Sequence, residues 1–329
     1  GLGESNKTVA KTVTLTVIGT NDKPTIKNVF ISENEVNGTQ NFTGQLTAKD
    51  LDINDVPTFE MVSTGGNNKD ITNDGRQFES IELNGVFAKV ISTKANLTDP
   101  SEIAEDRAML KAMVIDGISI NSTGLYTVTG NFDALTAQES VTLRFAYKVN
   151  DNSGSANAET QSKLVELTIQ GTNDAPTVVA APATTLSETD FATLSGYENA
   201  YKIITETEMY AILGANDVDV NDSLTLSLVT DSSNFTSSNA GIDNTTSGVV
   251  QLTAADITAL GITANVGDFF IYSLGFDGLN ASETSTATFN VILSDGTAPV
   301  TSTVTLTVNG VNDAPTVVAA PATTLSETD

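Results

Sequence analysis

The sequence of 329 residues contains no cysteine, no histidine and no tryptophan. Without cysteine there can be no disulfide, no thiolate nucleophile and no zinc–thiolate site. Without histidine the commonest general base and the commonest transition-metal ligand are missing, and a Ser-His-Asp triad is excluded. We therefore expect that the chain is not an enzyme. The remaining metal ligands are carboxylate, amide and backbone carbonyl oxygens, which suit hard cations, above all calcium.

Long apolar runs and basic charge are also scarce. No stretch of about 18 apolar residues occurs, so we expect no membrane insertion, and residues 1–11 lack the apolar core of a signal peptide. The 15 basic and 41 acidic residues give a net charge of −26. This charge disfavours nucleic acid and anionic membranes as partners and favours cations. The simpler alternative is that the acids only keep an extracellular protein soluble.

An internal repeat divides the chain. The segment NDAPTVVAAPATTLSETD starts at Asn173 and recurs unchanged from Asn312, 139 residues later, and a degenerate copy, NDKPTIKNVFISE, starts at Asn21. Each copy follows an alternating apolar–polar segment, at 11–18, 164–170 and 304–309. Each of these segments runs into the motif Gly-x-Asn-Asp-x-Pro, and the copy starts at the first Asn of that motif. The alternation predicts half-buried strands. Glycine and proline end each strand, and proline keeps the next residues extended, which predicts short, stiff connectors.

The repeat predicts four parts. Residues 1–20 are expected to be the last strand of a preceding repeat, 21–172 and 173–311 two complete domains, and 312–329 the start of the next repeat. Strands are predicted near 26–33, 41–48, 57–63, 78–83, 86–92, 112–120, 124–130, 140–149 and 162–170 in the first domain. In the second they are predicted near 203–205, 208–215, 223–230, 248–252, 269–276, 285–293 and 300–309. Many short strands separated by turn signals predict an all-β fold of tandem Greek-key sandwiches, cadherin- or immunoglobulin-like, joined end to end by calcium-binding connectors.

The first domain contains an additional segment, 64–115. Asn84-Gly85 predicts a hairpin within it, and Asp99 followed by Pro100 predicts a packing helix from Pro100 to Val114. A polar cluster of Asn67, Asn68, Asp70 and Arg76 makes this segment the place to look for a ligand site. In the second domain, 253–260 is predicted to be a short capped helical turn.

Four acidic features recur in the same order in both domains: an Asn-Asp connector, a glutamate soon after it, a D-x-D-x-N-D loop, and an aspartate after a late strand. The first domain supplies Asn21, Asp22, Glu33, Asp50, Asp52, Asp55 and Asp151; the second supplies Asn173, Asp174, Glu188, Asp217, Asp219, Asp222 and Asp295; Asn312 and Asp313 begin a third set. Alternate residues of an extended loop point to one side, and a sandwich gathers its loops at one end. Calcium takes six to eight oxygen ligands, and unneutralised carboxylates would repel one another. The pattern therefore predicts bound Ca2+.

The GTNDAP connector, the D-x-D loop and the late aspartate resemble those of cadherins. GLYTV at 124–128, FDAL at 132–135, VTLRFAY at 141–147 and VNDNSG at 149–154 resemble more closely the bacterial cadherin-like and VCBS-type repeats of large RTX or Bap-like biofilm adhesins. The second domain departs from the VCBS pattern in its middle. The cadherin D-R-E motif has no clear equivalent here.

This resemblance implies how the acids are shared between junctions. Asp22, Asp50, Asp52 and Asp151 would serve the first junction, and Glu33, Asn173, Asp174, Asp217, Asp219 and Asp295 the second. Glu188 would join Asn312 and Asp313 at a third.

The sequence and this resemblance predict a calcium-rigidified extender, or spacer, of a secreted bacterial surface adhesin that takes part in cell adhesion and biofilm formation. The resemblance implies an extracellular, cell-surface location reached by type I secretion. The expected partners are calcium ions, neighbouring repeats of the same chain, and a host or biofilm surface bound through other domains. Alternatives are a sugar- or protein-binding module at 64–115, a carboxylate glycosidase with two acids across a cleft, and an S-layer or exoenzyme spacer. Aromatic residues make up only 6% of the chain, which argues against a sugar-stacking site.

Overall fold

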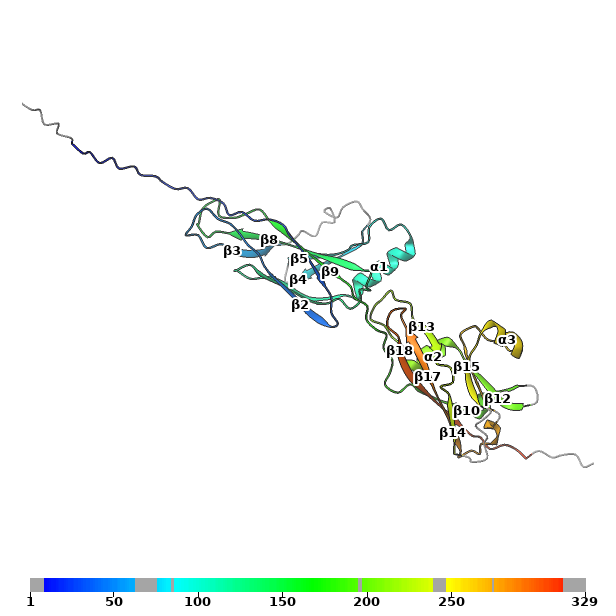
Figure 1. Cartoon of the computed structure of the whole chain (residues 1–329). Helices are drawn as coiled ribbons and strands as arrows, with labels where there is room; N and C mark the ends of the chain where they lie inside the picture. Colours follow the sequence, from blue (N-terminus) through cyan, green and yellow to red (C-terminus); the bar gives the residue numbers. More distant parts are fainter. Residues whose placement is uncertain are drawn as a thin grey trace, which may run out of the picture. The chain divides into compact units, whose positions relative to one another are not determined.

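The computed structural model describes residues 9–62, 76–83, 86–194, 197–238, 247–273 and 275–315. The chain forms two compact units. Unit 1 comprises Gly1–Phe132 and Gln138–Gly171, and unit 2 comprises Asp133–Ala137 and Thr172–Asp329. Both units consist mainly of β-strands (Figure 1). The predicted all-β class is confirmed.

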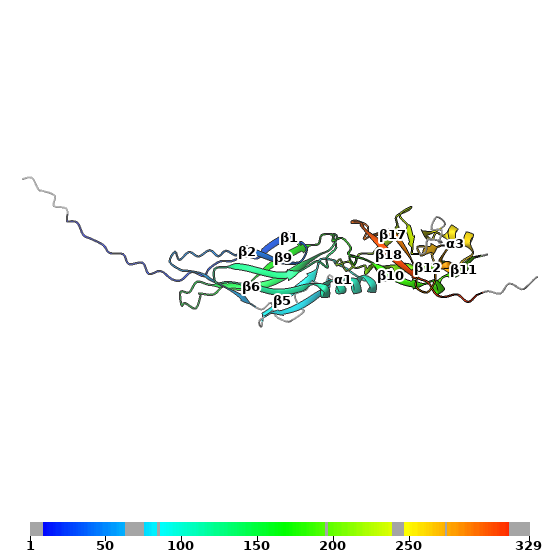
Figure 2. The same ribbon diagram turned by 90° about the horizontal axis from the view of Figure 1, so that it is seen from below.

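Unit 1 contains two sheets (Figures 1 and 2). The larger follows the order β1 (Val29–Asn34), β9 (Lys163–Gln170), β8 (Ser140–Asn150), β5 (Val86–Ser92) and β4 (Phe78–Leu83), and β3 (Thr58–Val62) also pairs with β8. The smaller follows the order β2 (Thr39–Gln45), β7 (Leu125–Asn131) and β6 (Val114–Ile120). Strand β1 runs parallel to β9, and the other pairs are antiparallel.

Alternating apolar side chains hold the two sheets of unit 1 together. Strand β8 reads SVTLRFAYKVN, and its Leu143, Phe145 and Tyr147 are fully buried. Because successive side chains of a strand point to opposite faces, one face of β8 is directed at the smaller sheet. The ring centroid of Phe145 lies 5.9 Å from that of Tyr126 on β7. These contacts close the core of a β-sandwich.

The described part of segment 64–115 belongs to this sandwich. Strands β4 and β5 pair with each other from Phe78↔Ile91 to Leu83↔Val86, and β5 also pairs with β8. Helix α1 (Pro100–Ala112) begins at Asp99, whose carboxylate accepts the Ser101 N–H at 2.8 Å, and it buries Asp106, Met109 and Leu110. The packing helix is thus present. Asn67, Asn68, Asp70 and the Asn84-Gly85 turn lie outside the described residues.

Unit 2 also contains two sheets. One follows the order β10 (Ala183–Ser187), β18 (Val300–Asn309), β17 (Thr284–Ser294) and β13 (Thr225–Leu228), with β14 (Asn234–Ser237) also on β17. The other follows the order β11 (Ala192–Leu194), β12 (Tyr197–Ile204), β16 (Phe269–Tyr272) and β15 (Gly248–Gln251). Phe269 of one sheet and Phe289 of the other are fully buried, with ring centroids 6.3 Å apart. Unit 2 is therefore a second β-sandwich.

The helices of unit 2 correct one prediction. The predicted strand at 208–215 is helix α2 (Glu206–Leu213). Thr205 caps it, the Glu208 carboxylate accepts the Thr205 N–H at 2.8 Å, and Gly214 ends it at φ 55°. The pattern of apolar residues in this segment predicts a strand. The reciprocal Thr-x-x-Glu capping stabilises a helix there instead. The predicted helical turn is α3 (Ala254–Leu260), capped by Thr253. The sequence pattern does not predict β10, β11 or β14.

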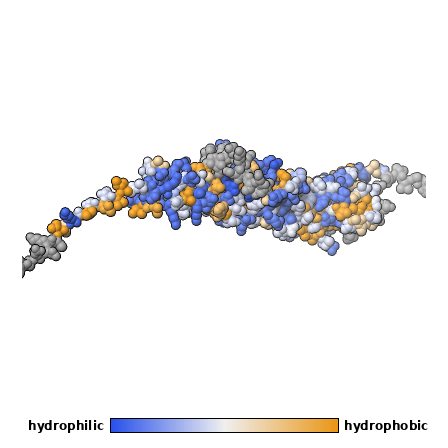
Figure 3. Space-filling view, turned by 90° about the horizontal axis from the view of Figure 1, so that it is seen from above, coloured by the Kyte–Doolittle hydropathy of each residue, from blue (hydrophilic) through white to orange (hydrophobic). Residues whose placement is uncertain are grey.

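The N-terminal segment of unit 1 corrects a second prediction. Residues 11–18 are predicted to be a strand, but residues 9–20 contain no strand. Val13, Leu15 and Val17 are exposed, and Figure 3 shows hydrophobic residues (orange) along the segment. The equivalent strand β18 has the same VTLTV sequence and is paired on both sides, with β10 and β17. The difference lies in the partners, because a strand is stable only when paired in a sheet.

Within the described ranges, no helix is long and apolar enough to cross a membrane.

The core of unit 1 predicts unequal effects for two phenylalanine substitutions. Phe145 is 0% exposed and Phe30 is 70% exposed. Phe145→Ala should lower the free energy of unfolding by about 3–5 kcal/mol because it leaves a cavity. Phe30→Ala should change it by less than about 0.5 kcal/mol. Urea unfolding followed by far-UV circular dichroism measures both, and equal losses would contradict this assignment of the core.

Candidate metal-binding sites

Three acids converge at one end of unit 1. Asp50 and Asp55 lie in the loop after β2, and Asp151 follows the last residue of β8. One carboxylate oxygen of each acid lies within 4.8 Å of an oxygen of the other two. The backbone bridge between Thr25 and Lys49, with N–H···O distances of 2.8 and 3.0 Å, holds the loop beside the connector. Residues from two distant parts of the sequence therefore form one acidic group beside the connector.

The connector of unit 1 is hydrogen-bonded to this group. The Asn21 amide donates to Asp151 Oδ2 at 3.0 Å, and the Asp22 N–H donates to Asp52 Oδ2 at 2.6 Å. The same Asn21 amide also donates to the Asp22 carbonyl at 3.3 Å. The Asn-Asp pair thus contacts the D-x-D loop and the late aspartate at once.

Unit 2 repeats this arrangement. Oxygens of Asp217, Asp222 and Asp295 lie within 4.8 Å of one another. The Asn173 amide donates to Asp295 Oδ2 at 3.0 Å, and the Asp174 N–H donates to Asp219 Oδ2 at 2.8 Å. The bridge between Thr177 and Asn216, at 2.7 and 3.0 Å, corresponds to the Thr25–Lys49 bridge. The predicted D-x-D-x-N-D loops therefore adopt the same geometry in both units.

Each loop leaves carboxylate oxygens without a partner. Asp50 Oδ1 accepts the Asp52 N–H at 3.0 Å, and Asp217 Oδ1 accepts the Asp219 N–H at 3.1 Å. The second oxygens, Asp50 Oδ2 and Asp217 Oδ2, are buried and accept no hydrogen bond, and the same holds for Asp219 Oδ1. A buried carboxylate oxygen without a partner costs free energy. A cation at these positions would remove that cost, so the donor set fits a hard metal ion.

The electrostatics of the two groups reflect this burial. Burial, followed by the nearby Asp222 and Asp174, raises the pKa of Asp219 to about 7. Burial also raises the pKa of Asp217 and of Asp55, with Asp295 and Asp151 as the respective repelling neighbours.

The late aspartates behave differently. Burial alone would raise the pKa of Asp151, but hydrogen bonds from the Ser153 N–H and the Asn21 amide outweigh it, so this pKa is lowered. The pKa of Asp295 is lowered for the same reason, by the Ala298 N–H and the Asn173 amide. Each site therefore contains a late aspartate with a lowered pKa beside at least one aspartate with a raised pKa.

The predicted glutamates lie elsewhere. Glu33 is exposed on β1 and belongs to none of the groups of three or more acids found among the described residues. Glu35, two residues further on, is buried. Glu188 is buried in unit 2, where its Oε1 accepts the Val311 N–H at 2.6 Å and its Oε2 has no partner.

Glu188 lies close to the third Asn-Asp pair. Burial raises its pKa, and Asp313 and Asp277 raise it further. Asn312 donates to the Asp313 carbonyl at 3.2 Å, as Asn21 and Asn173 do to Asp22 and Asp174. Sequence reasoning missed Asp277, which lies in a 3-10 helix (Phe276–Gly278) outside the repeated pattern.

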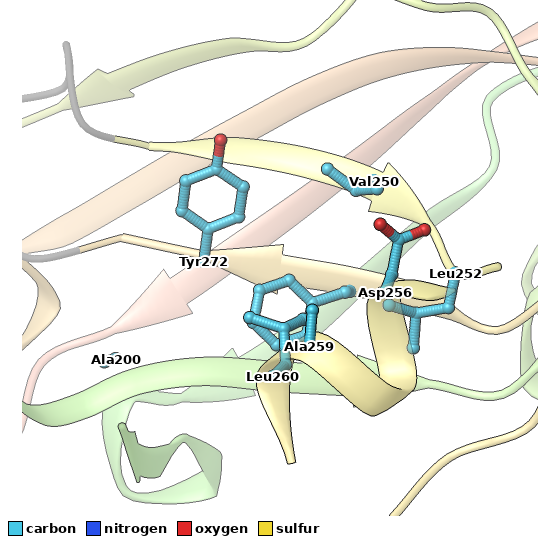
Figure 4. A pocket seen from close by; sticks show the side chains of 8 residues that line it. Ala200, Val250, Leu252, Asp256, Ala259, Leu260 and Tyr272 are labelled. Atoms are coloured by element: carbon cyan, nitrogen blue, oxygen red, sulfur yellow. The ribbon is translucent and has the colours of Figure 1, made fainter. Parts of the chain in front are cut away.

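A separate apolar pocket of about 390 Å³ lies in unit 2 beside α3 (Figure 4). Its described lining includes Val250, Leu260 and Phe270, with Tyr272 and Asp256 as the polar groups. Asp256 already accepts bonds from the backbone and hydroxyl of Thr253. The pocket offers mainly apolar contact.

The raised pKa of Asp219 predicts a pH effect in metal-free protein. The folded pKa of about 7 lies above the ordinary 3.8. The protonated form therefore contributes stability that is complete below about pH 4 and is lost as the pH rises through 7. Wild-type protein should lose stability relative to Asp219→Asn over this range, by on the order of a few kcal/mol.

Urea unfolding in EDTA at pH 4 to 7 measures this difference. The exposed Asp231, in the same unit, provides the control variant Asp231→Asn, which removes a carboxylate that belongs to none of the acidic groups among the described residues. If the stability difference between wild type and Asp219→Asn does not change with pH, the assignment of a raised pKa is wrong.

Comparison with known proteins finds similarity of structure only. No family model and no curated protein matches the sequence, so the resemblance to VCBS-type repeats stays a prediction. Mouse protocadherin-24 EC1-3 matches 88% of this chain and 70% of its own, with 13% identity and a TM-score of 0.33. Protocadherin Gamma B2 extracellular cadherin domains 3-6 match 88% of this chain and 52% of their own, with 13% identity and a TM-score of 0.32.

One comparison corrects a prediction. The endo-fucoidan hydrolase MfFcnA4, from glycoside hydrolase family 107, matches 87% of this chain, with 10% identity and a TM-score of 0.26. The chain spans 29% of the hydrolase. The prediction that the chain is not an enzyme is thereby overturned, because a hydrolase is among the similar structures and composition is no ground for excluding catalysis. The similarities concern the fold alone, and both units are β-sandwiches.

Proposed function

We propose that the chain is a calcium-stiffened extender of a secreted bacterial surface adhesin. The observation that carries the proposal is the pair of matching acidic groups, each with carboxylates within 4.8 Å of one another and with buried oxygens that accept no hydrogen bond. Calcium is the hard cation that takes many oxygen ligands in flexible geometry. Extracellular modules bind it at about 0.1–1 mM, so the sites would fill outside the cell.

The ligands would come from the connector, the loop and the late aspartate of each unit. In unit 1 these are Asn21, Asp22, Asp50, Asp52, Asp55 and Asp151; in unit 2 they are Asn173, Asp174, Asp217, Asp219, Asp222 and Asp295. Glu188, with one unpartnered oxygen, would join Asn312 and Asp313 in a third site of the same kind. We assign Glu33 to the junction that follows unit 1, as the resemblance to cadherins implies.

Calcium would act by fixing the connector. Only Gly171 and Thr172 separate the last residue of β9 from Asn173, which is hydrogen-bonded to Asp295. With calcium bound, the carboxylates around the connector no longer repel one another, and the short connector is held to the end of unit 2. Without calcium, this repulsion opposes the compact arrangement. A chain of such units would become stiffer and longer, which suits the spacing of an adhesive site from a cell surface.

The proposed extracellular location and partners follow from the same chemistry. Folding that depends on external calcium, in a chain without cysteine, suits an extracellular protein exported before it folds. The partners would be neighbouring repeats and, through other domains, a host or biofilm surface. The described part of 64–115 packs as β4, β5 and α1, which supports a structural role for that segment over a ligand site.

Calcium removal tests the proposal. Thermal unfolding and small-angle X-ray scattering are measured in EDTA and in millimolar calcium. Calcium at about 100 times its Kd should stabilise the protein by about 3 kcal/mol and lengthen the particle. Asp52→Asn and Asp219→Asn should each remove part of this gain.

The exposed Asp116 on β6 gives a matched control, since Asp116→Asn removes one negative charge away from both sites. Its response to calcium should equal that of wild-type protein. If neither the melting temperature nor the particle length responds to calcium in wild-type protein, the proposed stiffening is refuted.

A further inference from the structure

Four lysines gather around one short segment of unit 1, in a chain with only 15 basic residues. Two clefts lie along residues 23–27. Lys23 and Lys163 line a cleft of about 290 Å³, and Lys27 and Lys49 line a cleft of about 370 Å³. Thr25 and Ile26 line both, so the two clefts adjoin along the segment. We call these four lysines the lysine patch.

The lysines of the patch are available for binding. Lys23, Lys27 and Lys49 are exposed and Lys163 is half-buried. The described ion pairs of unit 1 involve other cations, namely Lys94, Arg144 and Lys148. The neighbouring Glu159 is paired with Lys148 at 2.9 Å. The patch therefore presents positive charge that no described carboxylate neutralises directly.

Two acids adjoin the patch in the sequence, Asp22 before Lys23 and Asp50 after Lys49. The Asp22 N–H donates to Asp52 Oδ2, and Asp50 Oδ1 accepts the Asp52 N–H, so the acidic loop holds both residues. The described ion pairs join neither acid to a lysine of the patch.

The backbone that carries the patch is held in place. Thr25 is bonded to Lys49 in both directions, at 2.8 and 3.0 Å. The Tyr147 hydroxyl donates to the Lys27 carbonyl at 2.8 Å, and the Leu164 N–H donates to Asn28 Oδ1 at 3.1 Å. A site preorganised in this way loses less entropy when a ligand binds.

We propose that the lysine patch binds a linear polysaccharide that carries carboxylate or sulfate groups. Lysine ammonium groups pair with such anions, and Thr25, Thr47, Thr160 and Gln161 in the clefts offer hydrogen bonds to sugar hydroxyls. Nucleic acid fits less well, because the described lining contains no aromatic side chain for base stacking.

A second copy of the chain is also a poorer partner. Each copy has a net charge of −26, so two copies repel as whole molecules. A thin polysaccharide chain can contact the patch alone, because salt screens charges beyond about 8 Å at physiological ionic strength. The proposal does not depend on calcium binding by the acidic sites.

The test compares two triple variants of the full chain. Lys23→Gln, Lys27→Gln and Lys49→Gln remove three charges from the patch. Lys11→Gln, Lys111→Gln and Lys202→Gln remove three charges elsewhere and serve as the matched control. All six changes replace lysines that are exposed or half-buried, and far-UV circular dichroism checks that both variants stay folded.

Binding is measured by titration calorimetry in EDTA at physiological ionic strength, and again in millimolar calcium. The probes are an oligogalacturonate, a heparin oligosaccharide, neutral dextran and a single-stranded DNA oligonucleotide. Wild-type protein should bind at least one anionic oligosaccharide, more weakly as salt rises, and should not bind dextran. The patch variant should lose about tenfold or more in affinity, since three exposed charge contacts disappear, while the control variant stays within about twofold.

The choice of probe distinguishes carboxylate from sulfate as the recognised group. Loss of binding in the patch variant alone supports the proposal, whichever anionic oligosaccharide binds. The proposal is overturned if wild-type protein binds neither anionic oligosaccharide. It is also overturned if both variants lose affinity equally, which would indicate bulk charge, or if DNA binds more tightly than either oligosaccharide.

Discussion

Repulsion between neighbouring carboxylates is the constraint on which the acidic ends of both units depend. In each unit the carboxylates lie within 4.8 Å of one another and are partly removed from water, so their repulsion must be offset. In both units, hydrogen bonds from the connector offset part of this repulsion. An asparagine amide and a backbone N–H of the connector bind the late aspartate and the second aspartate of the loop. One oxygen of Asp50 and one of Asp217 remain buried and unpaired. Hydrogen bonds therefore position the group, and a cation is what would complete it.

The β-sandwich makes this arrangement repeatable. Strands β8 and β17 have 11 residues each. Strand β17 buries alternate side chains, and β8 buries most of its side chains. Each strand is followed directly by its late aspartate, Asp151 or Asp295. The loop bridges Thr25–Lys49 and Thr177–Asn216 place the connector beside the D-x-D loop in each unit. The apolar core thus fixes where three separate acidic segments meet. The two units keep this geometry although their sheets differ in strand number and order.

Much of the fold could be predicted because its signals are local. The alternation in β8 and β9 and the turn residues between strands identify most elements of unit 1 within a few residues, and the alternation in β17 and β18 identifies the long strands of unit 2. The strand prediction over α2 failed because reciprocal capping by Thr205 and Glu208 outweighs a pattern of apolar residues. The strand prediction for 11–18 failed because pairing depends on a partner strand. The recurrence of the acidic features in both domains, with the gathering of loops at one end of a sandwich, could indicate that Asp217 and Asp295 meet. The burial of Glu188 and the approach of Asp277 depend on packing that no local pattern encodes.

Opposite charges lie along one short backbone segment of unit 1. Residues 21–28 direct Asn21 and Asp22 into contact with the acidic group, while Lys23 and Lys27 line clefts on the surface. The bridge from Thr25 to Lys49 continues this division into the loop, where Lys49 faces a cleft and Asp50 joins the acids. A cation bound by the acids would reduce the negative potential near the lysines, since charges this close are only partly screened. A metal site and an anion-binding surface on this segment would therefore strengthen each other, even though either can exist alone.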